Sequence, residues 1–464
     1  MLNVNAYAAL GGHMLLLARY IVPVSSPHIE NGAVLVKDGR IAAVGAAADL
    51  LRDYPNEPQT DFGLAVLMPG LVDAHSHWEY SAFRGLIQDV AYADWKIALT
   101  EKEERFNDQD WLDSALLGAL ETVRAGITTV ADITSTGASL HAAKAVGLRG
   151  IFYREVGTME KKEVPRILDE AYQEIEDWRS LAVDGFQYIG IAPEALYKCH
   201  PQVFNEIRDY AMDGTPVAVH LAGSQEEYDF IRYGSSLFSV HTTEMQRGYG
   251  IDMPPWLATG VSPIRYILNW GLFQVPNLLA IHCVHVDEDD IGFLEQYDVA
   301  VAICTRCNAQ LGMGIAPVPD LVRAGLRIGL GTDSPAASST TDLFAEMRMT
   351  LLIQRAVHLK SDFMTSAQLV RMATLGAAEA LGLADHIGSL DVGKDADIIA
   401  VSLQYSSQAP THDPNSAIVH TVGPDNIMMT MVGGNILYNG DHLHGVDRER
   451  VLARAEEMRI KLRD

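Results

Sequence analysis

Cysteine is scarce in this chain. The 464 residues include four cysteines, Cys199, Cys283, Cys304 and Cys307, too few and too scattered for the disulfide framework of a secreted domain. Cys304 and Cys307 have the spacing of half a zinc knuckle or of a redox pair, but no second pair accompanies them and each adjoins an apolar run. We therefore expect both in the core, in a protein of the reducing cytoplasm.

The chain also has few basic residues and few long apolar runs. The chain has 35 basic against 60 acidic residues and a formal net charge of -25, so its surface should repel nucleic acid and anionic membranes. The apolar stretch 14–24 is interrupted by Arg19 and is too short to span a bilayer. It also lacks the basic n-region and the small-residue cleavage site of a signal peptide. We therefore expect no nucleic-acid or membrane partner, while homo-oligomerisation stays open.

Hydrophobic residues make up 48% of the composition, enough for a core larger than one small domain needs. Residues 13–67 have the pattern of short strands at 14–22, 32–37 and 40–44. Asp38-Gly39 is a hairpin signal between the last two. This small β unit cannot bury both of its faces alone.

The middle of the chain alternates apolar strands with helical patterns, which is typical of a (β/α)8 TIM-like barrel with its chemistry at the C-terminal strand ends. The predicted strands are 71–77, 127–133, 149–156, 188–192, 217–221, 278–284, 299–304 and 327–333. The predicted helices between them include 110–125, 165–181, 202–212, 287–297 and 318–324.

Strands return near the C-terminus. After helices at 343–357 and 366–381, short strands are expected at 398–401, 427–432 and 435–438. We infer that they complete the N-terminal β unit. The predicted domains are a discontinuous β-sandwich from 1–67 and 388–446, a barrel at 68–387 and an exposed terminal helix at 447–464.

Five polar residues fall at the predicted strand ends. His75 and His77 close the first strand at i, i+2 spacing, which points both imidazoles to one side. Such a pair alone is more often hydrogen-bonded than metal-bound. His220, His282 and Asp333 end the fifth, sixth and eighth strands, and their meeting on one face of a barrel favours a metal site.

These residues belong to a longer pattern that resembles the amidohydrolase superfamily, in particular its branch of aminohydrolases and chlorohydrolases acting on nitrogen heterocycles. The resemblance runs nearly end to end. Its markers are PGLVDAHSH at 69–77, Arg84-Gly85, Asp94-Trp95, Gly126-Ile127-Thr128-Thr129, His282-Cys283, Arg306 with Asn308, Gly331-Thr332-Asp333-Ser334 and GSLDVGKDAD at 388–397.

The resemblance implies that His75, His77, His220 and Asp333 bind one divalent metal, zinc first and iron as the alternative. His282 would bind the substrate or the attacking water, and Asp333 would take a proton from that water. The implied reaction is deamination of a purine, pterin, triazine or nucleoside-like ring by metal-hydroxide attack. The alternatives are release of chloride, an alkylamine or another group, opening of a ring amide, and a metal-dependent ligand-binding protein with little turnover.

Two features separate this chain from other members. Binuclear relatives carry a carboxylated lysine on the fourth strand, but 188–192 contains none and Lys198 lies beyond Pro193. Deaminases of the branch usually carry a glutamate proton shuttle three residues after the strand-5 histidine, where this chain has Gly223. Glu194 is the first candidate to replace it and Glu226 the second. A leaving group that needs less protonation, or poor turnover, would also explain the glycine.

Substrate contacts are expected from the loops at the barrel mouth. Trp78, Arg84 and Trp95 follow the first strand, and Trp95 is the one we expect to line the pocket. Arg154, near the end of the third strand, would bind an acidic group, unless it pairs with a neighbour such as Glu155. Aromatic residues and glycines through 228–256 suggest a long loop over the mouth that acts as a lid.

Overall fold

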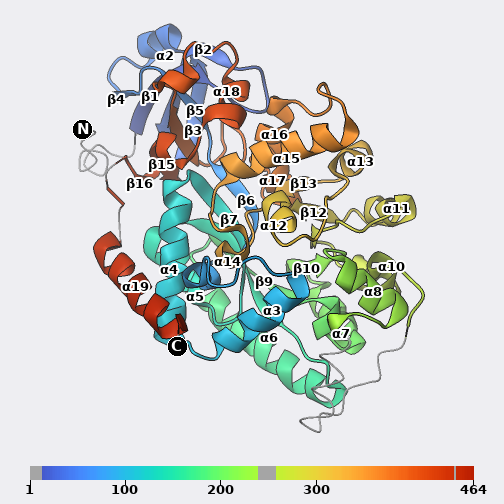
Figure 1. Cartoon of the computed structure of the whole chain (residues 1–464). Helices are drawn as coiled ribbons and strands as arrows, with labels where there is room; N and C mark the ends of the chain where they lie inside the picture. The colour runs from blue at the N-terminus through green and yellow to red at the C-terminus, as the bar shows by residue number, and fades with distance from the viewer. Residues whose placement is uncertain (1–12, 239–257, 441, 444–445, 464) are drawn as a thin grey trace.

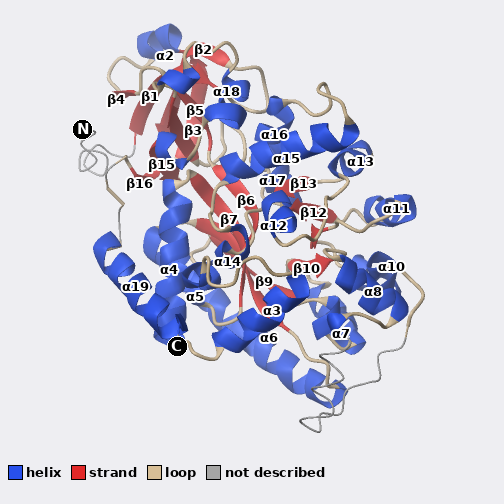
Figure 2. Cartoon of the chain, in the orientation of Figure 1, coloured by secondary structure: helices blue, strands red, loops and turns tan. Residues whose placement is uncertain are grey.

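The structure is a computed structural model that describes residues 13–238, 258–440, 442–443 and 446–463. Two regions stand out in Figures 1 and 2: a barrel wrapped by helices and, above it in this view, a separate sheet. Among the described residues, no helix has the length and apolar character that crossing a membrane requires.

The barrel consists of eight parallel strands, as predicted. Neighbouring strands pair in chain order, and a parallel bridge between Ser76 and Asp333 connects the first strand to the segment after the last. The strands are β6 Leu71–Ser76, β7 Ile127–Thr134, β8 Arg149–Val156, β9 Gln187–Pro193, β10 Val217–Leu221, β11 Leu278–His282, β12 Ala300–Ile303 and β13 Ile328–Leu330.

Helices cover the outside of the barrel, so a strand such as β7 is buried along its whole length. The longer helices are α3 Tyr92–Glu103, α4 Asp108–Arg124, α5 Ala138–Val146, α6 Val164–Leu181, α7 Pro201–Ala211, α8 Gln225–Tyr233, α11 Glu288–Gln296 and α15 Leu343–His358. Shorter ones are α2 Ala47–Asp53, α10 Pro263–Asn269, α12 Thr305–Gln310, α13 Val318–Arg323, α14 Pro335–Ser338, α16 Ser366–Met372, α17 Leu375–Ala380 and α18 Pro414–Thr421. The 3-10 turns are η1 Trp78–Phe83, η2 Lys161–Glu163, η3 Leu196–Lys198, η4 Leu272–Gln274, η5 Ser406–Gln408 and η6 Pro424–Asn426.

The second sheet joins the two parts of the chain that flank the barrel, as the sequence predicted. Its order is β16-β15-β14-β5-β1-β2-β3, with β4 on β1, so blue and red strands lie together in Figure 1. The strands are β1 His13–Ile21, β2 Ile29–Lys37, β3 Arg40–Ala46, β4 Gln59–Asp61, β5 Ala65–Pro69, β14 Ile398–Ser402, β15 Ile427–Val432 and β16 Asn435–Tyr438. The boundary expected between residues 67 and 68 falls inside β5.

A buried arginine joins this sheet to the barrel. Arg149 opens β8 and is almost fully enclosed. Its guanidinium donates to Asp397 at 2.8 Å and to Asp395 at 2.9 Å, just before β14. Because a buried charge is costly unless it is paired, these contacts hold the two regions in one arrangement.

The terminal helix α19, Arg448–Arg463, is not simply exposed. Val451, Met458 and Leu462 are buried, and Arg454 donates to Asp113 of α4 at 2.7 Å. The backbone oxygen of Leu462 also accepts from Lys102 Nζ of α3 at 3.3 Å. The helix therefore packs against the elements that follow the first barrel strand (Figure 1).

Candidate active site

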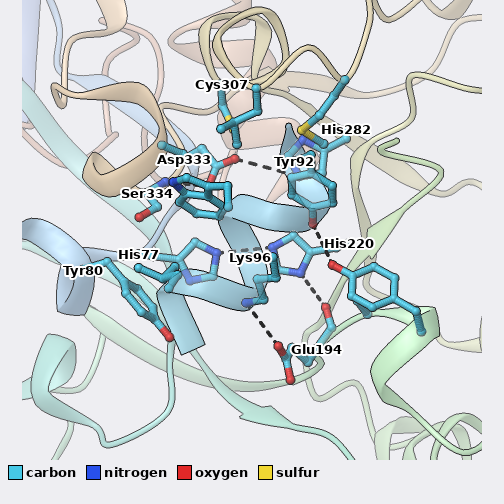
Figure 3. A pocket seen from close by; sticks show the side chains of 17 residues that line it. His77, Tyr80, Tyr92, Lys96, Glu194, His220, His282, Cys307, Asp333 and Ser334 are labelled. Carbon is cyan, nitrogen blue, oxygen red and sulfur yellow. Dashed lines mark hydrogen bonds and ion pairs between the residues drawn. The ribbon is translucent and has the colours of Figure 1, made fainter. Parts of the chain in front are cut away.

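A pocket opens at the C-terminal ends of the barrel strands. Its walls combine aromatic rings with a few polar groups that converge in Figure 3, the usual character of a small-molecule site. The lining residues are His77, Tyr80, Tyr92, Trp95, Lys96, Leu99, Glu194, Ala195, Tyr197, His220, His282, Cys307, Leu311, Met313, Asp333, Ser334 and Ala337.

Four histidines and one aspartate meet at the floor of this pocket. His75, His77 and His220 place ligand atoms within 4.8 Å of one another, and so do His75, His282 and Asp333. The Nε2 atoms of His77 and His220 face each other at 3.3 Å, while His75 Nε2 lies 3.5 Å from Asp333 Oδ1. The carboxylate and imidazole donors suit a divalent transition metal.

The protonation of the histidines fits metal binding. Burial lowers the pKa of His220 to about 3 and that of His282 to about 4, so both rings are neutral at pH 7. His220 Nδ1 lies 2.6 Å from the Glu194 backbone oxygen; by donating its hydrogen there, the ring turns the Nε2 lone pair toward the centre. His75 Nε2 is buried and has no hydrogen-bond partner among the described residues. A metal ion would provide that partner.

The carboxylate of Asp333 is held in its charged form. Burial opposes the charge, but His75, His282 and His77 outweigh it and keep the pKa of Asp333 well below its usual range. Its second oxygen lies 3.9 Å from His282 Nε2. An ionised carboxylate can bind a cation and accept a proton from water.

The backbone around these groups is strained. Left-handed φ angles occur at Ala222 (52°), His282 (78°), Cys283 (45°) and Asp333 (60°). Each costs of order 1–3 kcal/mol for a residue other than glycine. The backbone N–H of Asp333 donates to the His75 oxygen at 2.9 Å, which fixes one of these turns. Such strain clusters where a side chain must be aimed at a ligand.

The model of the amidohydrolase family matches residues 66–437. The chain belongs to the amidohydrolase family. The family predicted from the sequence motifs is thus confirmed. A second model, the bacterial imidazolonepropionase-like composite domain, matches residues 32–56, which cover part of β2, all of β3 and α2.

Among relatives of this amidohydrolase, one from Symbiobacterium thermophilum is 30% identical over 93% of this chain and 94% of its own. One from Pelotomaculum thermopropionicum is 29% identical over 93% and 94%. Both are named 5-methylthioadenosine/S-adenosylhomocysteine deaminase.

Solved structures share the fold. An adenosine deaminase from Xanthomonas campestris with bound zinc superposes with a TM-score of 0.83 at 25% identity, covering 97% of this chain and 98% of that one. The zinc complex of atrazine chlorohydrolase TrzN from Arthrobacter aurescens gives 0.81 at 23% identity, covering 96% and 99%.

The structure corrects the expected substrate contact at Arg154. Its guanidinium points out of the barrel, where it pairs with Glu174 of α6 and binds the backbone oxygen of Glu155. Side chains alternate along a strand, so the neighbours of Arg154 on β8 take the opposite side. Glu155 is half-buried and accepts from Ser135 Oγ at 2.7 Å.

Of the other residues predicted at the site, some line the pocket and others lie outside it. Trp95 and Glu194 line the pocket, whereas Trp78 is fully buried and Arg84 pairs with Glu121. Residues 228–233, part of the expected lid loop, lie in α8, and 239–257 lie outside the described residues. Cys304 and Cys307 are free and buried.

The turn after β10 explains how the structure accommodates Gly223. A Cβ atom there would lie 3.1 Å from both His282 Cδ2 and Met313 Cε, so glycine lets the histidine ring pack closely. The buried carboxylate is Glu227, not Glu226. Glu227 accepts from the N–H groups of Ala222 at 3.0 Å and Gly223 at 2.9 Å, and burial raises its pKa to about 7.

Sequence reasoning missed the tyrosine and lysine side chains of the pocket. Tyr92 and Tyr197 join through a hydroxyl–hydroxyl contact of 2.7 Å, and Lys96 Nζ lies 3.2 Å from Glu194. The spacing of Tyr92, Trp95, Lys96 and Leu99 is that of one helix face. Because Trp95 was expected in the pocket, this spacing could have predicted that Tyr92, Lys96 and Leu99 line it as well.

Proposed function

We propose that this amidohydrolase is a mononuclear metal-dependent hydrolase that deaminates a small amino-substituted nitrogen heterocycle of purine, pterin, triazine or nucleoside type. The carrying observation is the convergence of His75, His77, His220 and Asp333 in one pocket, with His282 beside them. The deaminase names of the relatives support this reading, as does the zinc-bound adenosine deaminase of similar fold.

In this proposal His75, His77, His220 and Asp333 hold one zinc ion, with iron as the alternative. A bound ion of this kind lowers the pKa of water to about 7 and polarises the substrate. A single ion agrees with the composition of β9, QYIGIAP, which has no lysine to bridge a second one.

Asp333 and His282 carry out the proton chemistry around the attacked carbon. Asp333 accepts a proton from the attacking water and returns it as the amine leaves, because its carboxylate lies between the histidines and the open pocket. His282, neutral at pH 7, is positioned to hydrogen-bond the substrate or that water.

Glu194 has a binding role in this scheme. Burial favours its neutral form, but Lys198 at 3.5 Å and Lys96 at 3.2 Å outweigh burial and lower its pKa. The two lysines therefore hold Glu194 as a carboxylate that accepts hydrogen bonds. We assign both proton transfers to Asp333, because it lies among the histidines at the open pocket.

Ammonia release tests the proposal. Zinc-loaded protein is incubated with adenosine, 5-methylthioadenosine, S-adenosylhomocysteine, a pterin and an aminotriazine, and ammonia is measured against a zinc-free control. Release from at least one compound, dependent on zinc, is expected. No release from any of them, despite full zinc occupancy, would contradict deamination.

Gly223 favours one alternative, a hydrolase that releases chloride, an alkylamine or another group, or opens a ring amide. Chloride leaves without a proton, so the usual glutamate is dispensable for it. Chloride release from a chlorotriazine, without ammonia from the panel, would select this function. Binding of ring compounds without any turnover would instead indicate a ligand-binding protein.

A further inference from the structure

Lys96 places a cation inside the pocket. It extends from α3, and its side chain is 18% exposed. Figure 3 shows it between His77, His220 and Glu194. A lysine so enclosed needs hydrogen-bond acceptors for its three donors, and the ion partner that the structure gives it is Glu194 at 3.2 Å.

Glu194 has a second cation in Lys198, 3.5 Å away. Lys198 is 35% exposed and does not line the pocket. Glu194 therefore keeps a counter-ion when Lys96 shares its ammonium with a ligand. Both lysines contact Oε1 of the same carboxylate, and of the two only Lys96 lines the pocket.

The charge balance of the pocket indicates what Lys96 binds. Lys96 is paired with Glu194, so it offers a ligand a directed donor that lies beside a carboxylate. A neutral oxygen acceptor matches such a donor better than a full anion, because an anion would lie against the negative charge of Glu194. The rings of Tyr92, Trp95 and Tyr197 form the adjoining wall, which suits a flat heterocycle.

We propose that Lys96 is a specificity-determining residue that donates a hydrogen bond to an oxo group on the substrate ring. The inference rests on the proposed deaminase function and narrows it: the favoured substrates are aminated heterocycles that also carry a ring carbonyl. Glu194 orients the ammonium and accepts from ring N–H groups nearby.

Two matched pairs of compounds test this preference. Cytosine and 4-aminopyrimidine have the same amine and differ in a ring oxo group, as do isoguanine and adenine. For the zinc-loaded wild type, kcat/KM should favour the oxo compound of each pair by about tenfold or more, as expected for a hydrogen bond from a charged donor. Lys96→Met should abolish most of that preference.

Lys198→Met is the matched control. It removes the other cation beside Glu194 without removing a pocket donor, so the oxo preference should persist. Lys96→Arg should retain part of the preference because it restores a charged donor. If Lys96→Met does not fold, as judged by circular dichroism and zinc content, Lys96→Gln replaces it and should weaken the preference.

The outcomes separate the two proposals. Equal kcat/KM within each pair, or a preference that survives in Lys96→Met, overturns the role of Lys96 and leaves deamination intact. If no compound releases ammonia, deamination fails, and the role of Lys96 is decided by equilibrium binding of the same pairs. Binding of cytosine and isoguanine that weakens about tenfold in Lys96→Met, but not in Lys198→Met, supports it; unchanged binding overturns it.

Discussion

Asp333 combines a geometric and a chemical task at one side chain. Its backbone is fixed in a left-handed turn by the hydrogen bond to His75, and its carboxylate faces three imidazoles. Replacement by asparagine keeps the size of the side chain but removes the charge and the proton acceptor. Asp333→Asn should therefore lower kcat by about 10² or more.

The control for this variant is its zinc content by elemental analysis, because the loss of a ligand and the loss of a base both reduce turnover. If the variant retains zinc but loses activity, Asp333 is needed as a proton acceptor and not only as a metal ligand. Wild-type turnover in Asp333→Asn is incompatible with the proposed chemistry.

Glu346 makes stability depend on pH. It is fully buried on α15, accepts from the Arg306 N–H at 3.0 Å, and burial raises its pKa from 4.5 to about 8. Between these values the folded state binds the proton more tightly than the unfolded state, so stability falls as pH rises, by up to about 1.4 kcal/mol per pH unit.

Glu346→Gln should remove this contribution because glutamine stays neutral. Denaturant titrations at pH 5 and pH 8 should show a smaller fall in unfolding free energy for the variant than for the wild type. Glu449→Gln, at an exposed position of α19, is the control and should follow the wild type. Parallel pH profiles for Glu346→Gln and the wild type would refute the assignment.

At the scale of single residues, the sequence located the histidines better than the substrate contacts. A barrel brings all its C-terminal strand ends to one face, so His75, His220 and Asp333 could be placed from periodicity alone. Side chains on a strand alternate between the inside and the outside of the barrel, and the sequence does not specify on which side Arg154 falls near the end of β8. The contact of Tyr92 with Tyr197 depends on two loop conformations, which periodicity does not specify.

Elements were predicted well where the pattern was regular. All eight barrel strands were expected, and so was the joining of the C-terminal strands to the N-terminal β unit. The helix expected at 366–381 is instead divided into α16 and α17 at Thr374, where φ and ψ are -136° and -100°. Gly376 there approaches Ile328 so closely that a Cβ would lie 2.9 Å from its oxygen. Such a close approach depends on the packing of segments that are distant in the sequence, so a local pattern does not predict it.

Because α19 contacts α3, a substitution on α19 should affect the pocket although it lies outside it. Leu462 is 1% exposed and belongs to the same apolar cluster as Trp95 and Leu99, while its backbone oxygen accepts from Lys102. Leu462→Ala should lower the unfolding free energy by about 2–5 kcal/mol. It should also raise KM more than it lowers kcat, because α3 carries binding groups.

Ile460→Ala is the comparison, since Ile460 is 53% exposed on the same helix and its loss should cost within about 0.5 kcal/mol. Thermal unfolding and steady-state kinetics on both variants measure the two effects. An unchanged KM in a destabilised Leu462→Ala would limit α19 to a structural role.

For the whole molecule, the proposed metal should act as a stabilising ligand. Its four ligands come from β6 and the residue after it, from the end of β10 and from the segment after β13, so one ion joins both sides of the barrel. Ligand at roughly 100 times its dissociation constant adds about 2.7 kcal/mol to the unfolding free energy. Chelation should lower Tm, and zinc should restore it.

Elemental analysis of the restored protein should find close to one zinc or iron per chain. Two ions per chain would contradict the mononuclear site. A Tm that does not change when the metal is removed would contradict the bridging role of the ligands, whatever the activity.

The pairing of Leu67 on β5 with Ala400 on β14 also sets an order of events during protein synthesis. These partners are separated by about 330 residues, and ribosomes add about 5–20 residues per second, so β5 waits roughly 15–70 s for its neighbour. Throughout that time one edge of an apolar strand is open to other chains. Nascent copies of this protein should therefore depend on chaperones until the last strands emerge.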